Sequence, residues 1–206
     1  MSTPSVQIVN DQATPLFTQL FAASGPRNRR KLLAAAAAKV RTRLIKHFGE
    51  RQREGNRHGW PSRYFWRGSR GQSVAEKTQV GAITDVSATV VIASAPFAFK
   101  VRGGVIVPRR GRYLAIPRTA EAYAAGSPRE GGIPGLFFVR RRGSESAFLA
   151  TRQGGRLIGH YRLVRRVRQQ KDTRALPAPG VLEAVLEQTA QSHMDRALTR
   201  RGGIAR

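Results

Sequence analysis

The sequence predicts an α+β protein with a long N-terminal helix, an antiparallel sheet with long loops, and a C-terminal helix. One stretch near each end of the chain carries apolar residues at spacings of three and four, the period of an amphipathic helix. Between them, short apolar runs alternate with turns rich in glycine and arginine, which is typical of antiparallel strands. We therefore expect an N-terminal arm at 1–27, a single α+β domain at 28–199 and a basic tail at 200–206.

The chain of 206 residues is strongly basic, with 37 Lys and Arg against 12 Asp and Glu and a net charge of +25. Hydrophobic residues still make up 40% of it, which excludes a disordered basic tail protein. Nearly all of the positive charge is arginine, whose planar guanidinium suits phosphate and carboxylate groups. Nucleic acid is therefore the first expected partner, and an acidic protein surface is the second.

The same composition excludes two further kinds of structure. The longest apolar run, Leu32–Ala38, is far shorter than the roughly 20 residues of a membrane-spanning helix, so we expect no membrane contact. The chain has no cysteine, so it forms neither a disulfide nor a thiolate zinc site. We expect a protein of the cytosol or of a particle assembled there.

Asn28 is the expected N-cap of a long helix that runs to about Glu54. The apolar residues expected to form its buried stripe are Leu33, Ala37, Val40, Leu44 and Phe48. The following loop, 56–79, interleaves aromatic and arginine side chains and has no periodicity. Such a loop either stacks unpaired bases or is pinned to the helix by Trp60 and Trp66, and we favour the second interpretation.

Seven strands are expected in the middle of the chain, at 80–83, 88–93, 105–107, 113–116, 136–139, 147–151 and 157–167. The first two turn back at Asp85, and the third pairs with the fourth through the turn 109–112. We expect 96–104 to be a bend, 119–126 a short helix or loop, and 127–135 a loop.

A final helix is expected from 181 to 199, after Pro177 and Pro179. Its expected apolar stripe comprises Leu182, Val185, Leu186, Thr189 and His193. Because the prolines break the chain just before it, this helix can dock on its own subunit or on a neighbour. Its candidate packing or assembly residues are Leu182, Val185 and Leu186.

Two clusters of arginine at sharp turns between expected strands are the candidate interaction residues. The first cluster is Arg109, Arg110 and Arg112, and the second is Arg140, Arg141 and Arg142. Hairpin tips project from a sheet, so these side chains are expected to be exposed and to contact DNA phosphates or an acidic partner. The alternative is that both clusters only keep the protein soluble.

The sequence offers no pattern typical of a catalytic or metal-binding site. The four aspartates are scattered, and none is paired at a spacing suited to two-metal phosphoryl transfer. The histidines, at 47, 58, 160 and 193, form no HxH or HxxxH pattern and are interpreted as surface or packing residues. Neither a GK[ST] phosphate loop nor a GxSxG turn occurs. We therefore expect a protein that is not an enzyme and that has no metal and no cofactor.

The most specific pattern lies between 96 and 117. The segment Pro96–Pro108 contains an aromatic-alanine pair, two adjacent glycines and an alternating strand, and it runs into Tyr113–Pro117. Upstream a long helix precedes Gly59–Pro61, and downstream a strand at 161–167 precedes a proline-containing turn and a last helix. Over 28–199 this arrangement resembles the phage virion-morphogenesis and tail-completion proteins. The chain departs from that family at Lys100–Gly103, where members usually have His-Gln-x-Gly.

The resemblance implies a structural component of a tailed-phage virion at the head–tail junction (neck) or tail end, which completes the tail or joins it to the head as part of a ring. Its implied partners are identical copies and neck, portal-adaptor or tail-tube and terminator proteins, with non-specific contact to genomic DNA. It is then expected in the virion after assembly in the host cytoplasm. The alternative is a stand-alone basic RNA- or DNA-binding protein, although no RRM, KH or helix-turn-helix signature appears.

Overall fold

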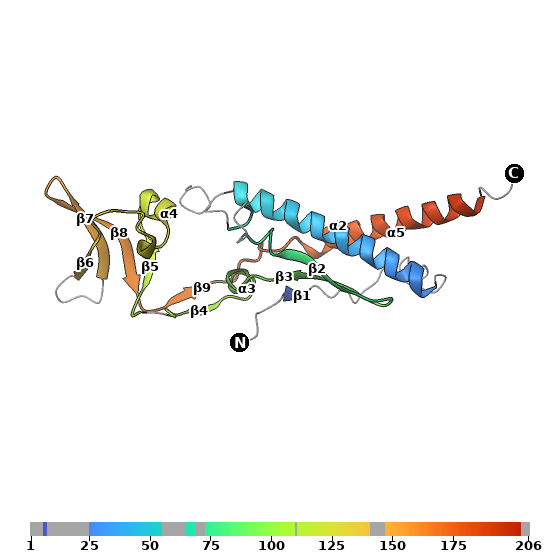
Figure 1. Ribbon diagram of the computed structural model, residues 1–206, viewed down its shortest axis with the longest axis horizontal. Coiled ribbons are helices and arrows are strands. Elements are labelled where there is room, and N and C mark those ends of the chain that lie inside the picture. Colours follow the sequence, from blue (N-terminus) through green and yellow to red (C-terminus); the bar gives the residue numbers. More distant parts are fainter. Residues whose placement is uncertain are drawn as a thin grey trace. The chain divides into compact units, whose positions relative to one another are not determined.

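The structure is a computed structural model that describes residues 6–7, 25–54, 65–68, 73–109, 111–140 and 147–202 (Figure 1). Its helices are α2 (Pro26–Arg53), α3 (Ala95–Arg102), α4 (Ala120–Ala125), α5 (Pro179–Gly202) and the 3₁₀ turn η1 (Pro128–Glu130). Its strands are β1 (Val6–Gln7), β2 (Thr78–Ile83), β3 (Ala88–Ile92), β4 (Gly104–Ile106), β5 (Leu114–Pro117), β6 (Phe137–Arg140), β7 (Ala147–Gln153), β8 (Arg156–Val164) and β9 (Val167–Gln169). The described strand pairs are all antiparallel, and the predicted α+β fold is confirmed.

The chain divides into two compact units, where we expected a single domain over 28–199. Unit 1 comprises Met1–Glu54, Tyr64–Val101 and Asp172–Arg206, and unit 2 comprises Gly55–Arg63 and Arg102–Lys171. The longer of the two segments that belong to unit 2 therefore begins at the end of α3 and ends before α5. Periodicity in a sequence reports local structure, so it did not indicate how contacts between distant segments divide the fold.

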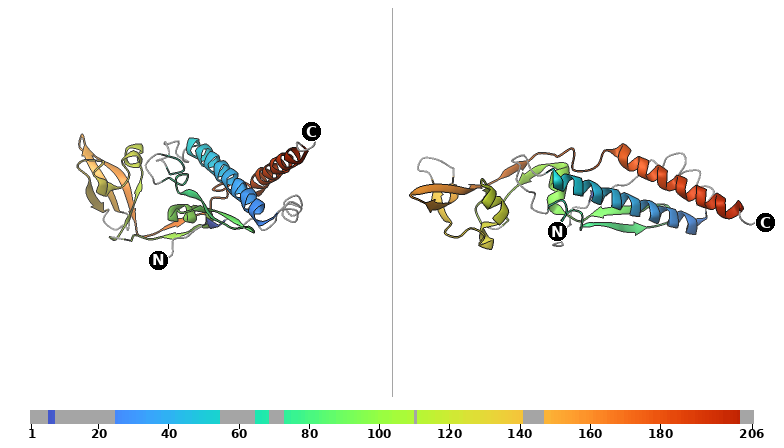
Figure 2. Two further views of the ribbon diagram at one scale, coloured as in Figure 1. Left: turned by 45° about the vertical axis from the view of Figure 1, so that its right-hand side comes forward. Right: turned by 90° about the horizontal axis from the view of Figure 1, so that it is seen from above.

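Unit 1 combines two long helices with a small sheet in the order β1–β3–β2. α2 packs on the sheet, and α5 packs against α2 (Figure 2). β2 and β3 form the hairpin that was expected around Asp85. The Thr84 hydroxyl accepts hydrogen bonds from the amides of Val86 and Ser87, so a side chain holds this turn.

α2 begins earlier than expected. Its N-cap is Gly25 and not Asn28, and no side chain caps it. Pro26 fills the first helical position, where its missing N–H costs nothing and its fixed φ favours the helix. The amides of Asn28 and Arg29 donate to the Gly25 carbonyl, so Asn28 already belongs to the first turn.

The buried face of α2 matches the expected stripe except near the start of the helix. The buried members of that stripe are Ala37, Val40, Leu44 and Phe48. Leu33 is only half-buried. Leu32 and Ala36 are buried because they pack against Ala190 of α5. The contact with α5 therefore widens the apolar stripe in this part of the helix.

An aromatic cluster forms the centre of unit 1. Phe48 stacks on Trp66 with ring centroids 6.1 Å apart, and it meets Phe97 edge-on at 5.5 Å. The Gln52 side chain accepts a hydrogen bond from the Trp66 amide. The prediction that Trp66 pins the loop to α2 is confirmed, and its 6% exposure excludes base stacking by this ring. Trp60 lies outside the described residues.

The expected bend at 96–104 is wrong over most of its length, because α3 occupies it. The Ser94 hydroxyl accepts a hydrogen bond from the Phe97 amide, and the Phe97 side chain is fully buried. Pro96 is tolerated because it lies in the first turn of the helix. α3 ends at Gly103, whose φ of +74° is the left-handed conformation common just after a helix.

Unit 2 contains a two-stranded ribbon, β4–β9, and a four-stranded sheet in the order β5–β8–β7–β6. The expected pairing of 105–107 with 113–116 is therefore wrong, because β4 pairs with β9 and β5 pairs with β8. The connection from β4 to β5 spans 107–113, which is longer than the tight turns that join hairpin strands. The basic segment 109–112 thus links two different sheets and is not a hairpin tip.

The register between β7 and β8 shifts once. Leu149 lies opposite Tyr161, and the next residue of β7, Ala150, lies opposite Gly159. His160 is therefore an extra residue in β8, as in a β-bulge. Because the bulge interrupts the alternation of side chains, His160 and Tyr161 are both buried and both contact the α4 segment.

α4 and the residues after it cover part of one face of the four-stranded sheet, which we call the inner face (Figure 1). On this face Phe138 of β6, opposite Leu149, remains 53% exposed. The buried core of the inner face is Ala122, Ile133 and Tyr161, with Ala115 and Leu149 packed against them. The Tyr161 hydroxyl donates to the Ala122 carbonyl at 3.1 Å. The alternate residues of each strand project from the opposite face, which we call the outer face.

Candidate interaction surface

The outer face brings arginine and apolar side chains into one row across all four strands of the sheet. Ile116 of β5 lies opposite Arg162 of β8. Arg162 lies opposite Phe148 of β7, and Phe148 lies opposite Val139 of β6. Residues opposed in antiparallel strands project to the same face with Cβ atoms about 4.5–5.5 Å apart. The row is therefore continuous from one edge of the sheet to the other.

Further apolar residues flank this row on the same face. Phe137 lies opposite Ala150 next to the row, and Leu157 lies opposite Arg152 near the β7–β8 turn. Ile116, Phe137 and Leu157 are 38%, 40% and 54% exposed. From here on, the outer face means Ile116, Arg118, Phe137, Val139, Phe148, Arg152, Leu157 and Arg162.

Arg118 extends the outer face beyond the end of β5. Its guanidinium carbon lies 5.5 Å from the centroid of the Phe148 ring, within the range of a cation–π contact. On the sheet side, Phe148 Cδ1 lies 3.7 Å from the position that a Cβ on Gly159 would take. The ring therefore lies between the backbone of β8 and the guanidinium, which explains why Phe148 is half-buried.

Positive charge is concentrated in unit 2. The range Arg102–Lys171 contains 16 Lys and Arg against 3 Asp and Glu. Among the described residues, none of Arg118, Arg152 and Arg162 has a carboxylate within ion-pair distance. These three guanidinium groups therefore keep their capacity to bind an external anion.

The structure places three of the six arginines that the sequence singled out. Arg109, Arg112 and Arg140 are exposed, as predicted. Arg110, Arg141 and Arg142 lie outside the described residues. Arg140 lies opposite Ala147, which lies opposite Leu163, so it belongs to the inner-face side of the sheet. Arg109 and Arg112 lie on the connection between the two sheets, so none of the three joins the row on the outer face.

Sequence reasoning missed Arg118, Arg152 and Arg162 because it looked for runs of adjacent arginines. The signal that would have found them is the alternation within strands. In Tyr161–Leu163 a single arginine stands between two apolar residues, and in Ile116–Arg118 an arginine lies two residues after an isoleucine. Residues two apart project from the same face of a strand, so isolated arginines can share a face with apolar side chains.

A buried histidine lies on the inner face. His160 is 1% exposed, with Nδ1 3.2 Å from Thr119 Oγ1 and Nε2 3.0 Å from Thr151 Oγ1. The Glu121 carboxylate lies 3.5 Å from Nδ1. Thr119 Oγ1 has a second role, because it caps α4 by accepting a hydrogen bond from the Ala122 amide. A hydroxyl, an imidazole and a carboxylate in contact are also the groups of a catalytic triad, but this histidine is closed to solvent. We therefore assign His160 to packing, as predicted.

The candidate assembly residues of α5 pack within the same chain. Leu182, Val185 and Leu186 are half-buried and lie against the core formed by α2, the aromatic cluster and the sheet. Leu186 also contacts the buried group of Leu32, Ala36 and Ala190. Of the two docking modes left open by the sequence, the structure contains the intramolecular one.

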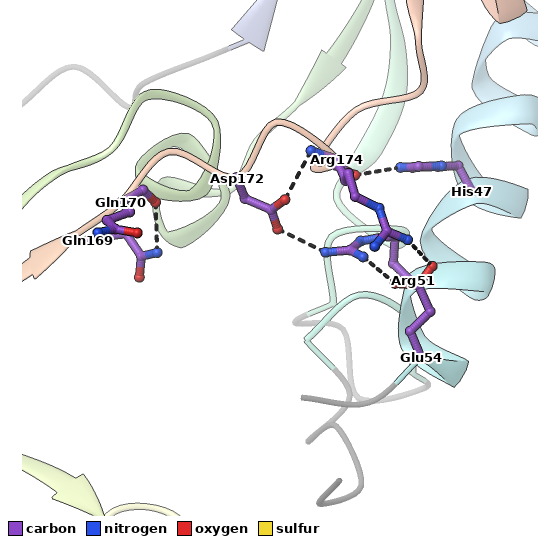
Figure 3. Close-up of polar contacts among 7 residues, drawn as sticks. All are labelled: His47, Arg51, Glu54, Gln169, Gln170, Asp172 and Arg174. Carbon is purple, nitrogen blue, oxygen red and sulfur yellow. Dashed lines mark hydrogen bonds and ion pairs between the residues drawn. The ribbon is translucent and has the colours of Figure 1, made fainter. Parts of the chain in front are cut away.

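A polar network fixes the segment that enters α5 (Figure 3). Arg51, in the last turn of α2, donates to Asp172 at 2.9 Å and also forms an ion pair with Glu54. Arg174 donates to Glu54 at 2.7 Å, and the Arg174 carbonyl lies 3.1 Å from His47 Nε2. The end of α2 therefore holds residues 172–174 in place, just before α5 begins.

In the described part of the chain, no group of three or more His, Cys, Asp or Glu side chains is placed to hold a metal ion. Among the described residues, no helix is long and apolar enough to span a membrane. No family model, curated protein or solved structure matches the chain.

Proposed function

We propose that the protein is a structural component of a tailed-phage virion at the head–tail junction (neck) or tail end, and that it acts as part of a ring of identical copies. The observation that carries this proposal is the sequence pattern of 96–117, the segment with the sharpest resemblance to the virion-morphogenesis and tail-completion proteins. Phe97 is buried in the core of unit 1, and Gly103 ends α3 with a positive φ. Ile116 lies on the outer face of unit 2. These residues of the pattern therefore have structural roles in both units.

Such a protein completes the tail, or joins it to the head, by shape and charge complementarity and without turnover. Its partners are other copies of itself and neighbouring neck, portal-adaptor or tail-tube and terminator proteins. The exposed apolar side chains offer hydrophobic contacts, and the excess of arginine offers charged contacts. Arginines that line a DNA passage attract phosphates whatever the sequence, so no base-reading motif is needed.

A stand-alone basic RNA- or DNA-binding protein is the second candidate. The observation that favours it is the set of arginines on the outer face with no carboxylate partner among the described residues, Arg118, Arg152 and Arg162. Neutralisation of phosphates by such groups supplies most of the affinity in non-specific binding. This candidate needs no ring and no protein partner.

Size-exclusion chromatography with light scattering, on nuclease-treated protein, separates the two candidates. The proposal predicts a ring of fixed stoichiometry that persists without nucleic acid and is visible by negative-stain electron microscopy. A monomer that binds RNA and DNA tightly at low salt, and forms no ring at any protein concentration tested, would contradict the proposal and support the second candidate.

A further inference from the structure

We propose that the outer face of the four-stranded sheet binds an acidic segment of another protein, one that presents apolar side chains between its carboxylates. This inference goes beyond the proposed function and does not depend on a role in a virion. It rests on the combination of apolar and cationic side chains that the strand registers bring together on one surface of unit 2.

Apolar side chains of the outer face lie on both sides of Arg162. Ile116 lies on one side of Arg162 in the row, and Phe148 and Val139 lie on the other side with Phe137 next to them. Leu157 lies further along the same face, near the β7–β8 turn. Single exposed apolar residues are ordinary on a protein surface, but several of them on one face of a sheet favour an interaction site. A partner that covers this patch therefore has to contribute apolar side chains of its own.

The charged part of the surface lies within and around the apolar part. Arg162 occupies the centre of the row, Arg118 lies over Phe148, and Arg152 lies opposite Leu157. Guanidinium groups are more weakly hydrated than ammonium groups, so an interface desolvates them at lower cost. Carboxylates of the partner can each accept two parallel hydrogen bonds from such a group. A segment in which acidic residues lie between apolar ones matches this mixture of arginine and apolar side chains.

Two other occupants fit the surface less well. Phosphates of a nucleic acid would pair with the arginines, but they gain nothing from Ile116, Val139 and Leu157. Phe148 already has Arg118 over its ring, so this face of the ring is not free for a base. A second copy docked through the same face would bring arginine against arginine, since Arg102–Lys171 has 16 basic and 3 acidic residues.

Fluorescence anisotropy with three labelled probes tests the proposal on the full chain. The probes are a short peptide in which Glu and Leu alternate, the same peptide with Ser in place of Leu, and an oligo-dT strand. We expect the Glu/Leu peptide to bind about tenfold more tightly than the Glu/Ser peptide, because only it covers the apolar patch. Equal binding of the two peptides, or tighter binding of oligo-dT than of the Glu/Leu peptide, would overturn the proposal.

Matched variants locate the binding site of the Glu/Leu peptide. I116S/L157S removes apolar contacts and R152S/R162S removes charges, and each is expected to raise the Kd about tenfold. The controls are V86S, at an exposed apolar residue of unit 1, and R168S, at an exposed arginine of β9. Melting temperatures verify that each variant is folded. If the control variants weaken binding as much as the outer-face variants do, the peptide binds through general charge and the proposal is wrong.

Discussion

The guanidinium of Arg51 donates a 2.9 Å hydrogen bond to the carboxylate of Asp172, which joins residues 121 positions apart. Arg51 also forms an ion pair with Glu54, and its guanidinium carbon lies 5.3 Å from the centroid of the Trp66 ring. One side chain thus connects the end of α2, the aromatic core and the segment that enters α5. The side chains of Arg51 and Asp172 are only 15% and 22% exposed, so water screens their interaction poorly.

Arg51→Ala is expected to lower the free energy of unfolding by about 1 to 3 kcal/mol, because it leaves the Asp172 carboxylate half-buried without its cation. Urea denaturation followed by circular dichroism measures this loss. The matched control is Arg53→Ala in the same turn of α2, since Arg53 is exposed and has no ion pair among the described residues. A double-mutant cycle with Asp172→Ala isolates the pair, and additive losses would show that the two residues do not interact.

Thr151→Val is expected to lower the free energy of unfolding by about 1 to 3 kcal/mol, because it removes the hydroxyl 3.0 Å from Nε2 of the buried His160. The two side chains have similar volumes, so the loss reports the hydrogen bond and not a cavity. Thr173→Val at an exposed position is the control and is expected to change stability by less than about 0.5 kcal/mol. Equal stability of Thr151→Val and the native chain in urea denaturation would show that His160 needs no partner at Nε2.

Most local elements of this fold, with the exception of α3, could be predicted from the sequence, because local patterns determine them. Apolar residues at spacings of three and four located α2 and α5, and short apolar runs on either side of Asp85 located β2 and β3. Gly154 and Gly155, with φ of +54° and +80°, form the two-residue turn that separates β7 from β8 as expected. At each of these places one short stretch of sequence contains the whole signal.

Features that depend on distant residues could not be predicted in this way. The pairing of β5 with β8 brings Ala115 opposite Leu163, a choice that no pattern within 105–117 reveals. The extra residue His160 in β8 is visible only once β7 is in place. The outer face was missed for the same reason, because Ile116, Arg162 and Phe148 come from three strands. The sequence indicated an excess of arginine but not which arginines share a surface with apolar side chains.

Gly103→Ala is expected to destabilise the protein by about 1 to 3 kcal/mol, since its φ of +74° is strained for any residue with a Cβ. An added Cβ would also lie 3.1 Å from the Gln169 carbonyl oxygen and 3.2 Å from the Lys171 amide nitrogen. Both are backbone atoms, which shift less easily than the end of a flexible side chain. Gly131→Ala is the matched control, because Gly131 has a φ of +73° with nothing within 4 Å of the added atom. Thermal unfolding of both variants separates backbone strain from crowding, and equal losses would exclude crowding at Gly103.

Leu182→Asp combined with Leu186→Asp is expected to destabilise unit 1 itself, by several kcal/mol, because both side chains pack against the core of the same chain. Lower yield of folded protein and loss of cooperative thermal unfolding are the expected observations. Gln188→Ala, at an exposed position of the same helix, is expected to leave the melting temperature unchanged. A double variant that melts like the native chain but fails to assemble would instead place these leucines in a contact between subunits.

Arg109→Ser combined with Arg112→Ser is expected to leave folding intact, within about 0.5 kcal/mol, because both side chains are exposed and have no ion pair among the described residues. If these arginines contact phosphates, DNA affinity falls, and its dependence on salt becomes shallower because binding releases fewer counterions. A salt series of DNA-binding isotherms measures both quantities. Arg53→Ser controls for the loss of a single exposed arginine in unit 1. Unchanged affinity and an unchanged salt slope would assign Arg109 and Arg112 to solubility alone. The contact with anionic partners would then belong to other arginines, and Arg118, Arg152 and Arg162 would be the next set to replace.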